Sequence, residues 1–218
     1  MSAFPLVLSA PSGGGKTTVT KRLMEQRADI GYSVSCTTRA PRAGEVNGVD
    51  YHFFSEQQFI QHRDRGDFAE WAVVHGKLYG TLKSAVTKVL AGGKHLIMDI
   101  DVQGAAQFAA AWPTAVLVFM LPPSVEVLLA RLQARNTEDG ATLLTRLRSA
   151  HAELKAATGY HYVLVNDDLQ ATVARVSSII DAEDVKRERI STLDAQLTGL
   201  IGTLDAEIRR HTTKGEFR

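Results

Sequence analysis

Near its start the chain reads Leu6-Val-Leu-Ser-Ala-Pro-Ser-Gly-Gly-Gly-Lys-Thr-Thr18. A short apolar run leads into a glycine-rich loop, and apolar residues such as Val19 and Leu23 then recur at helical spacing. This order predicts a strand, a loop and a helix over 16–26. A loop of this kind points several backbone N–H groups at one spot, beside the positive end of the helix dipole. It therefore predicts a site for the phosphates of a nucleoside triphosphate.

The side chains of this loop fit the same prediction. Lys16 is placed to reach the β- and γ-phosphates, and the Thr17 hydroxyl is a ligand for Mg²⁺. The usual pattern begins with glycine, where this chain has Ala10. A glycine-rich turn that only caps a helix is the alternative, and the preceding apolar run and the Gly-Lys-Thr-Thr ending argue against it. We assign phosphate binding to Ser12, Gly13, Gly14, Gly15, Lys16, Thr17 and Thr18.

Further apolar runs with helical patterns between them extend this reading to the rest of the chain. The runs are 95–99, 115–120 and 162–165, and the helical patterns are 82–90, 125–134 and 141–157. Continuous apolar runs are typical of strands buried on both faces of a parallel sheet. Their alternation with helices predicts an α/β fold with a doubly wound sheet.

Two segments interrupt the alternation. The first has short strand-like pieces with polar turns, and the second is rich in arginine. We therefore expect one domain with two insertions and a polar helical tail. The expected ranges are a core at 4–34, 82–125 and 151–185, a mostly-β insertion at 35–81, an arginine-rich insertion at 126–150 and the tail at 186–218.

Composition restricts where such a protein acts. The chain has 218 residues, 44% of them hydrophobic, and a net charge of +1, so no long-range attraction draws it to nucleic acid or an anionic membrane. A single cysteine, Cys36, excludes an intrachain disulfide, and no signal peptide is evident. We expect a cytoplasmic protein without nucleic-acid or membrane partners. The tail is compatible with packing on its own core, pairing in a homodimer or higher homo-oligomer, or mobility.

A second motif follows the loop, Ser33-Val-Ser-Cys-Thr-Thr-Arg-Ala-Pro-Arg-Ala-Gly-Glu-Val-Asn-Gly-Val-Asp-Tyr-His-Phe53. Arg39 and Arg42 are three residues apart, and Pro41 restricts the backbone between them. Two guanidinium groups at this spacing can converge on one phosphate with charge-assisted hydrogen bonds, to which Tyr51 can add a hydroxyl. Taken alone, two surface arginines beside a turn proline would be the simpler interpretation.

The residues around the two arginines decide between these interpretations, because the motif resembles the signature of the guanylate kinase family. Other landmarks of that family occur in its order over roughly residues 4 to 185. Beside the phosphate loop they are Phe68-Ala-Glu-Trp71, Tyr79-Gly-Thr81, Asp99-Ile-Asp-Val-Gln-Gly104, Pro122-Pro-Ser124 and Val165-Asn-Asp-Asp168.

The resemblance implies a P-loop nucleoside monophosphate kinase fold with a parallel sheet core. In it, 35–81 becomes a GMP-binding subdomain and 126–150 a helical lid. It implies transfer of the γ-phosphoryl group of ATP to GMP, which gives ADP and GDP. The implied grip on the GMP phosphate is Arg39, Arg42, Tyr51 and Tyr79. The implied guanine readers are Ser35, Glu70, Thr81 and Asp101, although the family often has serine where Thr81 stands.

The chemistry of guanine suits these readers. Guanine presents an N1–H and an N2 amino group side by side, and a carboxylate such as Glu70 can accept from both. Asp101 can take the remaining amino hydrogen, and Ser35 can donate to O6. Adenine reverses this pattern and would leave a buried carboxylate unpaired. An exposed strand carboxylate is the plain alternative for Glu70.

Phosphoryl transfer to a phosphate needs no protein base, so the expected catalysis is alignment and charge neutralisation. Lys16, Arg39, Arg135 and Arg146 are the expected catalytic cations, the last two reaching the ATP phosphates when the lid closes. Thr17 and Asp99 are the expected Mg²⁺ contacts. Asp99 also has a helix N-cap as an alternative role, for which Asp101 is better placed. For Arg131 and Arg148, a solvated helix face remains an equal alternative.

Two rival functions remain at this stage. A non-catalytic module of the same fold would use the cleft to hold a partner protein, but such modules typically have a degraded phosphate loop. A kinase for AMP or UMP is the second rival, and competition between monophosphates in a turnover assay distinguishes it.

Overall fold

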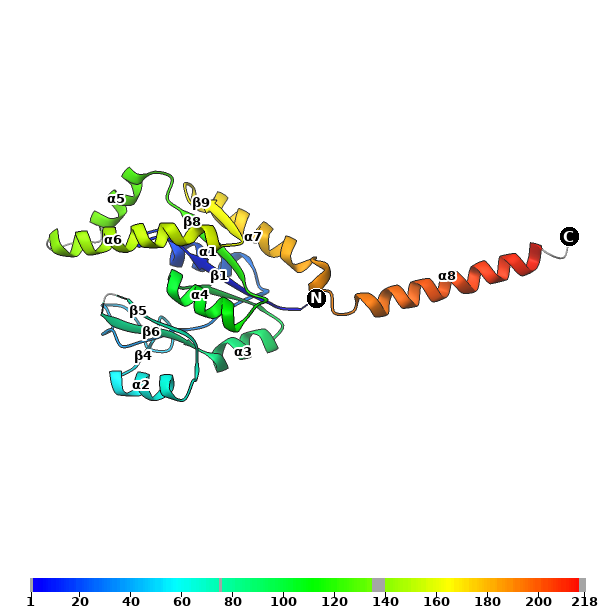
Figure 1. Cartoon of the computed structure of the whole chain (residues 1–218), viewed down its shortest axis with the longest axis horizontal. Coiled ribbons are helices and arrows are strands. Elements are labelled where there is room, and N and C mark those ends of the chain that lie inside the picture. Colours follow the sequence, from blue (N-terminus) through cyan, green and yellow to red (C-terminus); the bar gives the residue numbers. More distant parts are fainter. Residues whose placement is uncertain (1, 75, 135–139, 216–218) are drawn as a thin grey trace. The chain divides into compact units, whose positions relative to one another are not determined.

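The structure is a computed structural model that describes residues 2–74, 76–134 and 140–215. Its central sheet has five parallel strands in the order β2-β7-β1-β8-β9. This confirms the α/β fold with a parallel core (Figure 1). The strands are β1 (Pro5–Ser9), β2 (Ile30–Tyr32), β7 (His95–Asp99), β8 (Val116–Leu121) and β9 (Tyr162–Val165).

Strand β1 lies at the centre of this sheet and is buried along its whole length. Leu6 pairs with Ile97 of β7 on one side and with Val116 of β8 on the other. Burial on both faces explains why the strand is a continuous apolar run. The sequence did not predict β2, a strand of three residues with Gly31 in its middle.

Three helices pack on the sheet, α1 (Lys16–Gln26), α3 (Lys83–Ala91) and α4 (Val102–Ala111). Val19 and Leu23 of α1 are fully buried, as their spacing predicted. Val86 of α3 and Phe108 of α4 join Val7 and its neighbours in one apolar cluster. This cluster fixes the start of α4 beside the carboxyl end of β7, where two acidic side chains emerge.

A second sheet, with the order β4-β3-β6-β5, occupies the range predicted for the first insertion. Its members are β3 (Cys36–Thr37), β4 (His52–Phe53), β5 (Phe68–Val74) and β6 (Lys77–Leu82), and it also carries α2 (Glu56–Asp64). Cys36, Phe59 and Phe68 form its own small core. Helix α4 lies between the two sheets (Figure 1), and it contacts both β1 and β5.

The second insertion holds two helices, α5 (Val125–Ala134) and α6 (Gly140–Lys155), followed by the 3-10 turn η1 (Ala156–Gly159). Leu128 and Leu132 of α5 pack against Ala150 of α6. Arg135, which was expected to reach ATP, lies outside the described residues.

The chain divides into two compact units, Ala3–Ser178 and Met1–Ser2 with Ile179–Arg218. The division falls within α7 (Leu169–Asp184). The smaller unit continues through the 3-10 turn η2 (Arg187–Arg189) to α8 (Leu193–Gly215). In the part of the chain that the structure describes, no helix combines the length and the apolar character needed to cross a membrane.

Candidate active site

The phosphate loop has the backbone geometry that its glycines predicted. Gly13 and Gly15 have positive φ angles, 81° and 85°, which side chains other than glycine rarely allow. At Gly14 the limit is space, because a Cβ there would lie 2.5 Å from the Ala10 Cβ and 2.8 Å from the Pro11 carbonyl oxygen. The turn therefore needs glycine at three successive positions before α1 begins at Lys16.

Contacts from distant parts of the chain hold this loop. The Lys16 Nζ donates to the Ala10 carbonyl oxygen at 2.9 Å, which places the ammonium group against the loop. The Asn166 Nδ2, at the end of β9, donates to the Gly14 carbonyl oxygen at 2.8 Å. The loop is thus anchored from the strand that ends beside it.

Thr17 and Asp99 meet at the carboxyl edge of the sheet, as predicted. The Thr17 Oγ1 donates to the Asp99 Oδ2 at 2.7 Å, and the Tyr32 hydroxyl donates to Oδ1 of the same carboxylate at 2.8 Å. Desolvation and the charge of Asp99 raise the pKa of Tyr32, which keeps it a donor. Hydroxyl and carboxylate oxygens are the hard ligands that Mg²⁺ prefers, so the residues fit this cation.

The two acids after β7 have separate structural roles. Asp101, not Asp99, is the N-cap of α4, and its Oδ1 accepts from the backbone N–H groups of Gln103 and Gly104 at 2.7 and 3.0 Å. The Asp99 carboxylate instead accepts the hydrogen bonds from Thr17 and Tyr32. The alternative that Asp99 caps the helix is wrong.

Helix α6 reaches the phosphate loop with two charged side chains. The Ser12 backbone N–H donates to the Glu153 Oε2 at 2.9 Å, and the Arg146 Nη2 lies 3.4 Å from the Ser12 Oγ. Burial raises the pKa of Glu153, and the nearby charge of Lys16 opposes that shift. Helix α6 therefore presents both an acidic and a basic side chain to the loop.

Arg131 also lies at the loop. Its Nη2 is 3.4 Å from the Asn166 carbonyl oxygen, and its side chain lies beside Gly13. Its Nη1 is buried without a hydrogen-bond partner among the described residues. A buried, unpaired guanidinium N–H is costly, so this position favours a ligand contact over a solvated helix face.

Glu70 is the central acid of the second sheet. It is only 4% exposed and pairs across the strands with Thr81. Desolvation raises its pKa to about 7, the charge of Asp101 adds to this rise, and hydrogen bonds from Thr81 oppose it. Burial excludes the interpretation of Glu70 as an exposed strand carboxylate.

The glycine at position 104 leaves the space that this carboxylate occupies. A Cβ on Gly104 would lie 2.6 Å from the Glu70 Oε2. Nearby, the Ser35 Oγ and the Thr81 Oγ1 are 3.2 Å apart and share a hydrogen bond. The predicted guanine readers Ser35, Glu70 and Thr81 therefore lie together, with Asp101 close enough to shift the Glu70 pKa.

Arg39 is the centre of the expected phosphate grip. Its guanidinium donates to both Glu45 carboxylate oxygens, at 2.9 and 2.8 Å, and to the Tyr79 hydroxyl at 3.2 Å. Its Cζ lies 5.4 Å from the centre of the Tyr51 ring, within cation–π range. Arg42 is exposed, and its backbone N–H donates to Glu45 at 2.7 Å. Three of the four residues expected to bind the GMP phosphate, Arg39, Tyr51 and Tyr79, thus lie together, and Arg42 is exposed near them.

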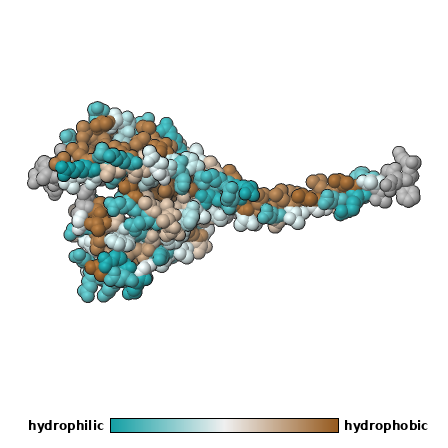
Figure 2. Space-filling view, viewed as in Figure 1, coloured by the Kyte–Doolittle hydropathy of each residue, from teal (hydrophilic) through white to brown (hydrophobic). Residues whose placement is uncertain are grey.

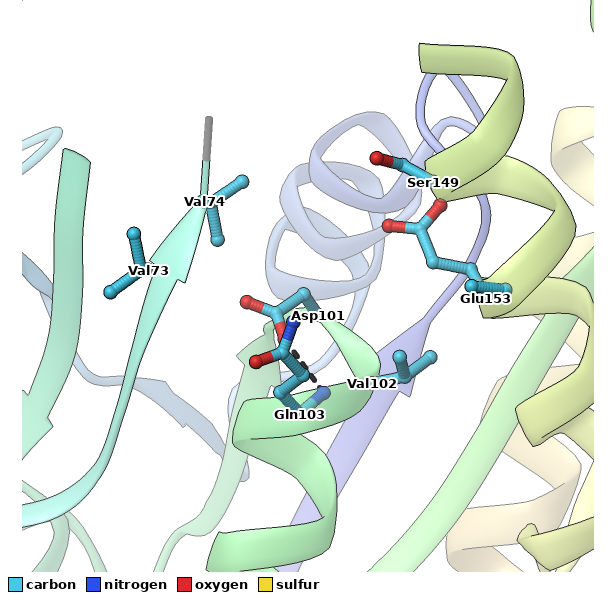
Figure 3. A pocket seen from close by; sticks show the side chains of 8 residues that line it. Val73, Val74, Asp101, Val102, Gln103, Ser149 and Glu153 are labelled. Atoms are coloured by element: carbon cyan, nitrogen blue, oxygen red, sulfur yellow. Dashed lines mark hydrogen bonds between the residues drawn. The ribbon is translucent and has the colours of Figure 1, made fainter. Parts of the chain in front are cut away.

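A pocket of about 170 Å³ lies between β5, the start of α4 and α6. Figure 3 shows its walls: Val73 and Val74 on β5, Asp101 and Gln103 at the start of α4, and Ser149 and Glu153 on α6. It is thus bordered both by the sheet that carries Glu70 and by the helix that contacts the phosphate loop.

Similar sequences in known proteins cover most of this chain. The family model described as "Guanylate kinase" matches residues 2–183. The guanylate kinase of Anaeromyxobacter dehalogenans is 49% identical over 183 residues, 83% of this chain and 81% of the relative. The guanylate kinase of Chelativorans sp. is 44% identical over 197 residues, 90% of each.

The chain belongs to the guanylate kinase family.

Its fold is also that of a solved guanylate kinase. The crystal structure of the enzyme from Anaplasma phagocytophilum is 33% identical in sequence and covers 91% of this chain and 95% of its own, with a TM-score of 0.76. The chain accordingly catalyses the ATP-dependent phosphorylation of GMP to GDP that defines guanylate kinases.

Four residues of this guanylate kinase site had no role predicted from the sequence. Tyr32 donates a hydrogen bond to Asp99, and Glu153 accepts one from Ser12. The two residues of each pair are far apart in the sequence, so no local sequence pattern shows the contact. Glu45 and Gly104 stood inside the quoted motifs, and their positions there were the available signal.

Proposed function

We propose that the chain divides its guanylate kinase reaction between two ends of one cleft. The loop 12–18 holds ATP, and the sheet with Glu70 and Arg39 holds GMP. The observation that supports this most strongly is the buried Glu70 carboxylate with the Thr81 hydroxyl beside it and Gly104 making room for it. A buried acid without a charged partner is unfavourable by itself, so its position fits a ligand that donates two hydrogen bonds.

At the ATP end, the amides of the loop and the Lys16 ammonium would bind the phosphates. Thr17 and Asp99 would hold Mg²⁺, with Tyr32 keeping the Asp99 carboxylate in position. When bound, the cation neutralises charge on the phosphates. Arg146 would add to this, together with Arg135, which lies outside the described residues. Arg131 would contact the nucleotide through its unpaired Nη1.

At the GMP end, Glu70 would accept from the guanine N1–H and N2 amino group. Ser35, Thr81 and Asp101 would complete the recognition of the base. Arg39, Tyr51 and Tyr79 would bind the phosphate, and the exposed Arg42 would reach it from solvent. Glu45 orients the Arg39 guanidinium before the substrate binds.

The transfer itself would depend on alignment, because the GMP phosphate is already a nucleophile. Lys16, Arg39, Arg135 and Arg146 would surround the charge of the transferring group. The proposal assigns the enzyme no nucleic-acid or membrane partner, in keeping with its net charge of +1. It places the enzyme in the cytoplasm, where both nucleotides are available.

A turnover panel with Glu70→Gln tests the proposal. ADP release from ATP–Mg²⁺ is measured with GMP, AMP and UMP as acceptors. Loss of a charged acceptor should lower kcat/KM for GMP by about 100-fold, since such hydrogen bonds contribute roughly 1.5–3 kcal/mol. The KM for ATP should not change.

Glu56→Gln, an exposed acid on α2, is the matched control and should behave as the wild type. A Glu70→Gln variant with unchanged kcat/KM for GMP would contradict the assignment of the guanine site. Preferred turnover of AMP or UMP by the wild type would contradict the substrate.

A further inference from the structure

Helix α8 carries an apolar stripe that the catalytic site does not use. The stripe consists of Leu193, Leu197, Leu200, Ile201, Leu204 and Ile208. Five of these side chains are 45–63% exposed, and Leu193 is half-buried. Figure 2 shows a row of hydrophobic residues along this helix. The family model ends at residue 183, before α8 begins.

The composition of α8 gives it little stability as a lone helix. Gly199 and Gly202 lie in its interior, with Thr198 and Thr203 nearby, and all four are poor helix formers. Helices of this kind are stabilised mainly by packing of an apolar face. At 3.6 residues per turn, the two glycines fall opposite the stripe. The stripe is therefore the face that packing would cover.

The spacing of the stripe favours a second copy of this chain as its partner. Leu200 and Ile201 flank its midpoint, Leu197 and Leu204 lie equally far on either side, and so do Leu193 and Ile208. A two-fold axis through that midpoint superposes the stripe on itself in the opposite direction. An isologous interface needs this self-complementarity, because each patch meets a second copy of itself. A different protein, a lipid surface or a parallel pair would not require it.

We propose that the stripe of α8 packs against the same stripe of a second copy of this chain, with the two helices antiparallel. Leu200 and Ile201 lie at the centre of the pair, and Leu193 of one copy lies opposite Ile208 of the other. Apolar spacings of three and four residues allow the side chains of two such helices to interdigitate. The result is a homodimer joined outside the catalytic unit.

Sedimentation equilibrium of the full chain tests the pairing. The wild type should sediment at twice the chain mass at micromolar concentration. The double variant Leu200→Lys/Leu204→Lys should raise the dissociation constant at least ~100-fold, because each dimer loses four apolar side chains and gains four charges at the interface. GMP-dependent turnover of the diluted variant shows that it is folded, since no α8 residue belongs to the catalytic site.

The matched control is Ala195→Lys/Ala206→Lys, which adds the same charges to exposed positions opposite the stripe. It should remain dimeric. A wild type that is monomeric throughout the micromolar range overturns the proposal, whether its stripe then proves protected by its own chain or bound to vesicles with anionic lipid. Equal dissociation by both double variants also overturns it.

Disulfide trapping tests the direction of the pair. Leu200→Cys lies at the centre and should form an interchain disulfide on oxidation, because a disulfide needs Cα atoms about 4.4–6.8 Å apart. Ile208→Cys should not cross-link to itself, but it should cross-link to Leu193→Cys in a mixture. Self-cross-linking of Ile208→Cys overturns the antiparallel arrangement. The native Cys36 is buried, and the wild type oxidised in parallel controls for it.

Discussion

The two ends of the proposed cleft differ in which groups form them, main-chain groups at one end and side chains at the other. The phosphate loop is built from main-chain groups and three glycines, and its geometry is fixed by the turn itself. The proposed GMP end is built from side chains of β5, β6 and the loops beside β3, held by contacts with one another such as Arg39 with Glu45 and Ser35 with Thr81. The loop therefore tolerates few substitutions, whereas the GMP end is adjustable by substitution and by pH.

This difference also separates the two tasks of the enzyme. Main-chain amides recognise any phosphate and cannot distinguish one base from another. In the proposed site, side chains such as Glu70 would distinguish bases, but burying a carboxylate is unfavourable when no ligand is bound, as the raised pKa of Glu70 indicates. Selectivity is concentrated where the unliganded structure is least favourable.

The largest expected effect is on the loop. Lys16→Ala removes the one side-chain cation that contacts the loop from within its own helix. We expect kcat to fall by about 10³-fold or more, because a lost electrostatic contact to transferring charge has effects of this size. ADP release at saturating ATP and GMP measures it. Lys21→Ala, an exposed lysine on the same helix, is the control, and an active Lys16→Ala enzyme would refute the role of the loop lysine.

A smaller effect is expected from a methyl group at the GMP end. In Gly104→Ala the new Cβ meets the end of the Glu70 side chain at 2.6 Å, so the carboxylate must move. We expect the KM for GMP to rise roughly tenfold, as overpacking by one methyl costs at least about 1 kcal/mol. The KM for ATP should change little.

Gly159→Ala is the control for this substitution, because a Cβ at that glycine meets no atom within 4 Å. Steady-state kinetics on both variants separate a local effect from a general one. Equal KM values for GMP in Gly104→Ala and the wild type would show that the Glu70 carboxylate is not held where guanine binds.

The smallest effect is that of pH. In the proposed site Glu70 would have to be ionised to accept two guanine N–H groups, and its pKa is raised to about 7. The ionised fraction therefore falls as pH decreases, and kcat/KM for GMP should drop about fivefold between pH 7 and pH 6. The KM for ATP is measured alongside, because the Glu153 carboxyl at the loop also has a raised pKa.

Glu70→Gln separates this titration from that of the GMP phosphate, which has a pKa of about 6. The ratio of wild-type to variant kcat/KM should retain only the Glu70 step. Because the folded pKa lies above the unfolded one, the folded state binds more protons between the two values, and Glu70 lowers stability as pH rises toward 7. Above pH 7 the variant should unfold at a higher temperature than the wild type. A pH-independent ratio would contradict the raised pKa.

The sequence predicted the main-chain parts of this molecule better than the side-chain contacts. Apolar runs and glycines determine β1, the phosphate loop and α1 within short segments, and these were found as expected. Glu153 and Ser12 are brought together only by the packing of α6 over the domain, so no local pattern reports their hydrogen bond. Likewise, the choice between Asp99 and Asp101 as helix cap depended on where β7 ends, which an apolar run does not fix to the residue.

The hydrogen bond from Ser12 to Glu153 has a consequence for the affinity of the phosphate loop. A phosphate that takes the Ser12 amide competes with a carboxylate already bonded to it. The affinity of the loop for a nucleotide then depends on how much more strongly the loop binds a phosphate than it binds the Glu153 carboxylate. A change that loosens α6 would alter the measured dissociation constant even where it contacts no ligand.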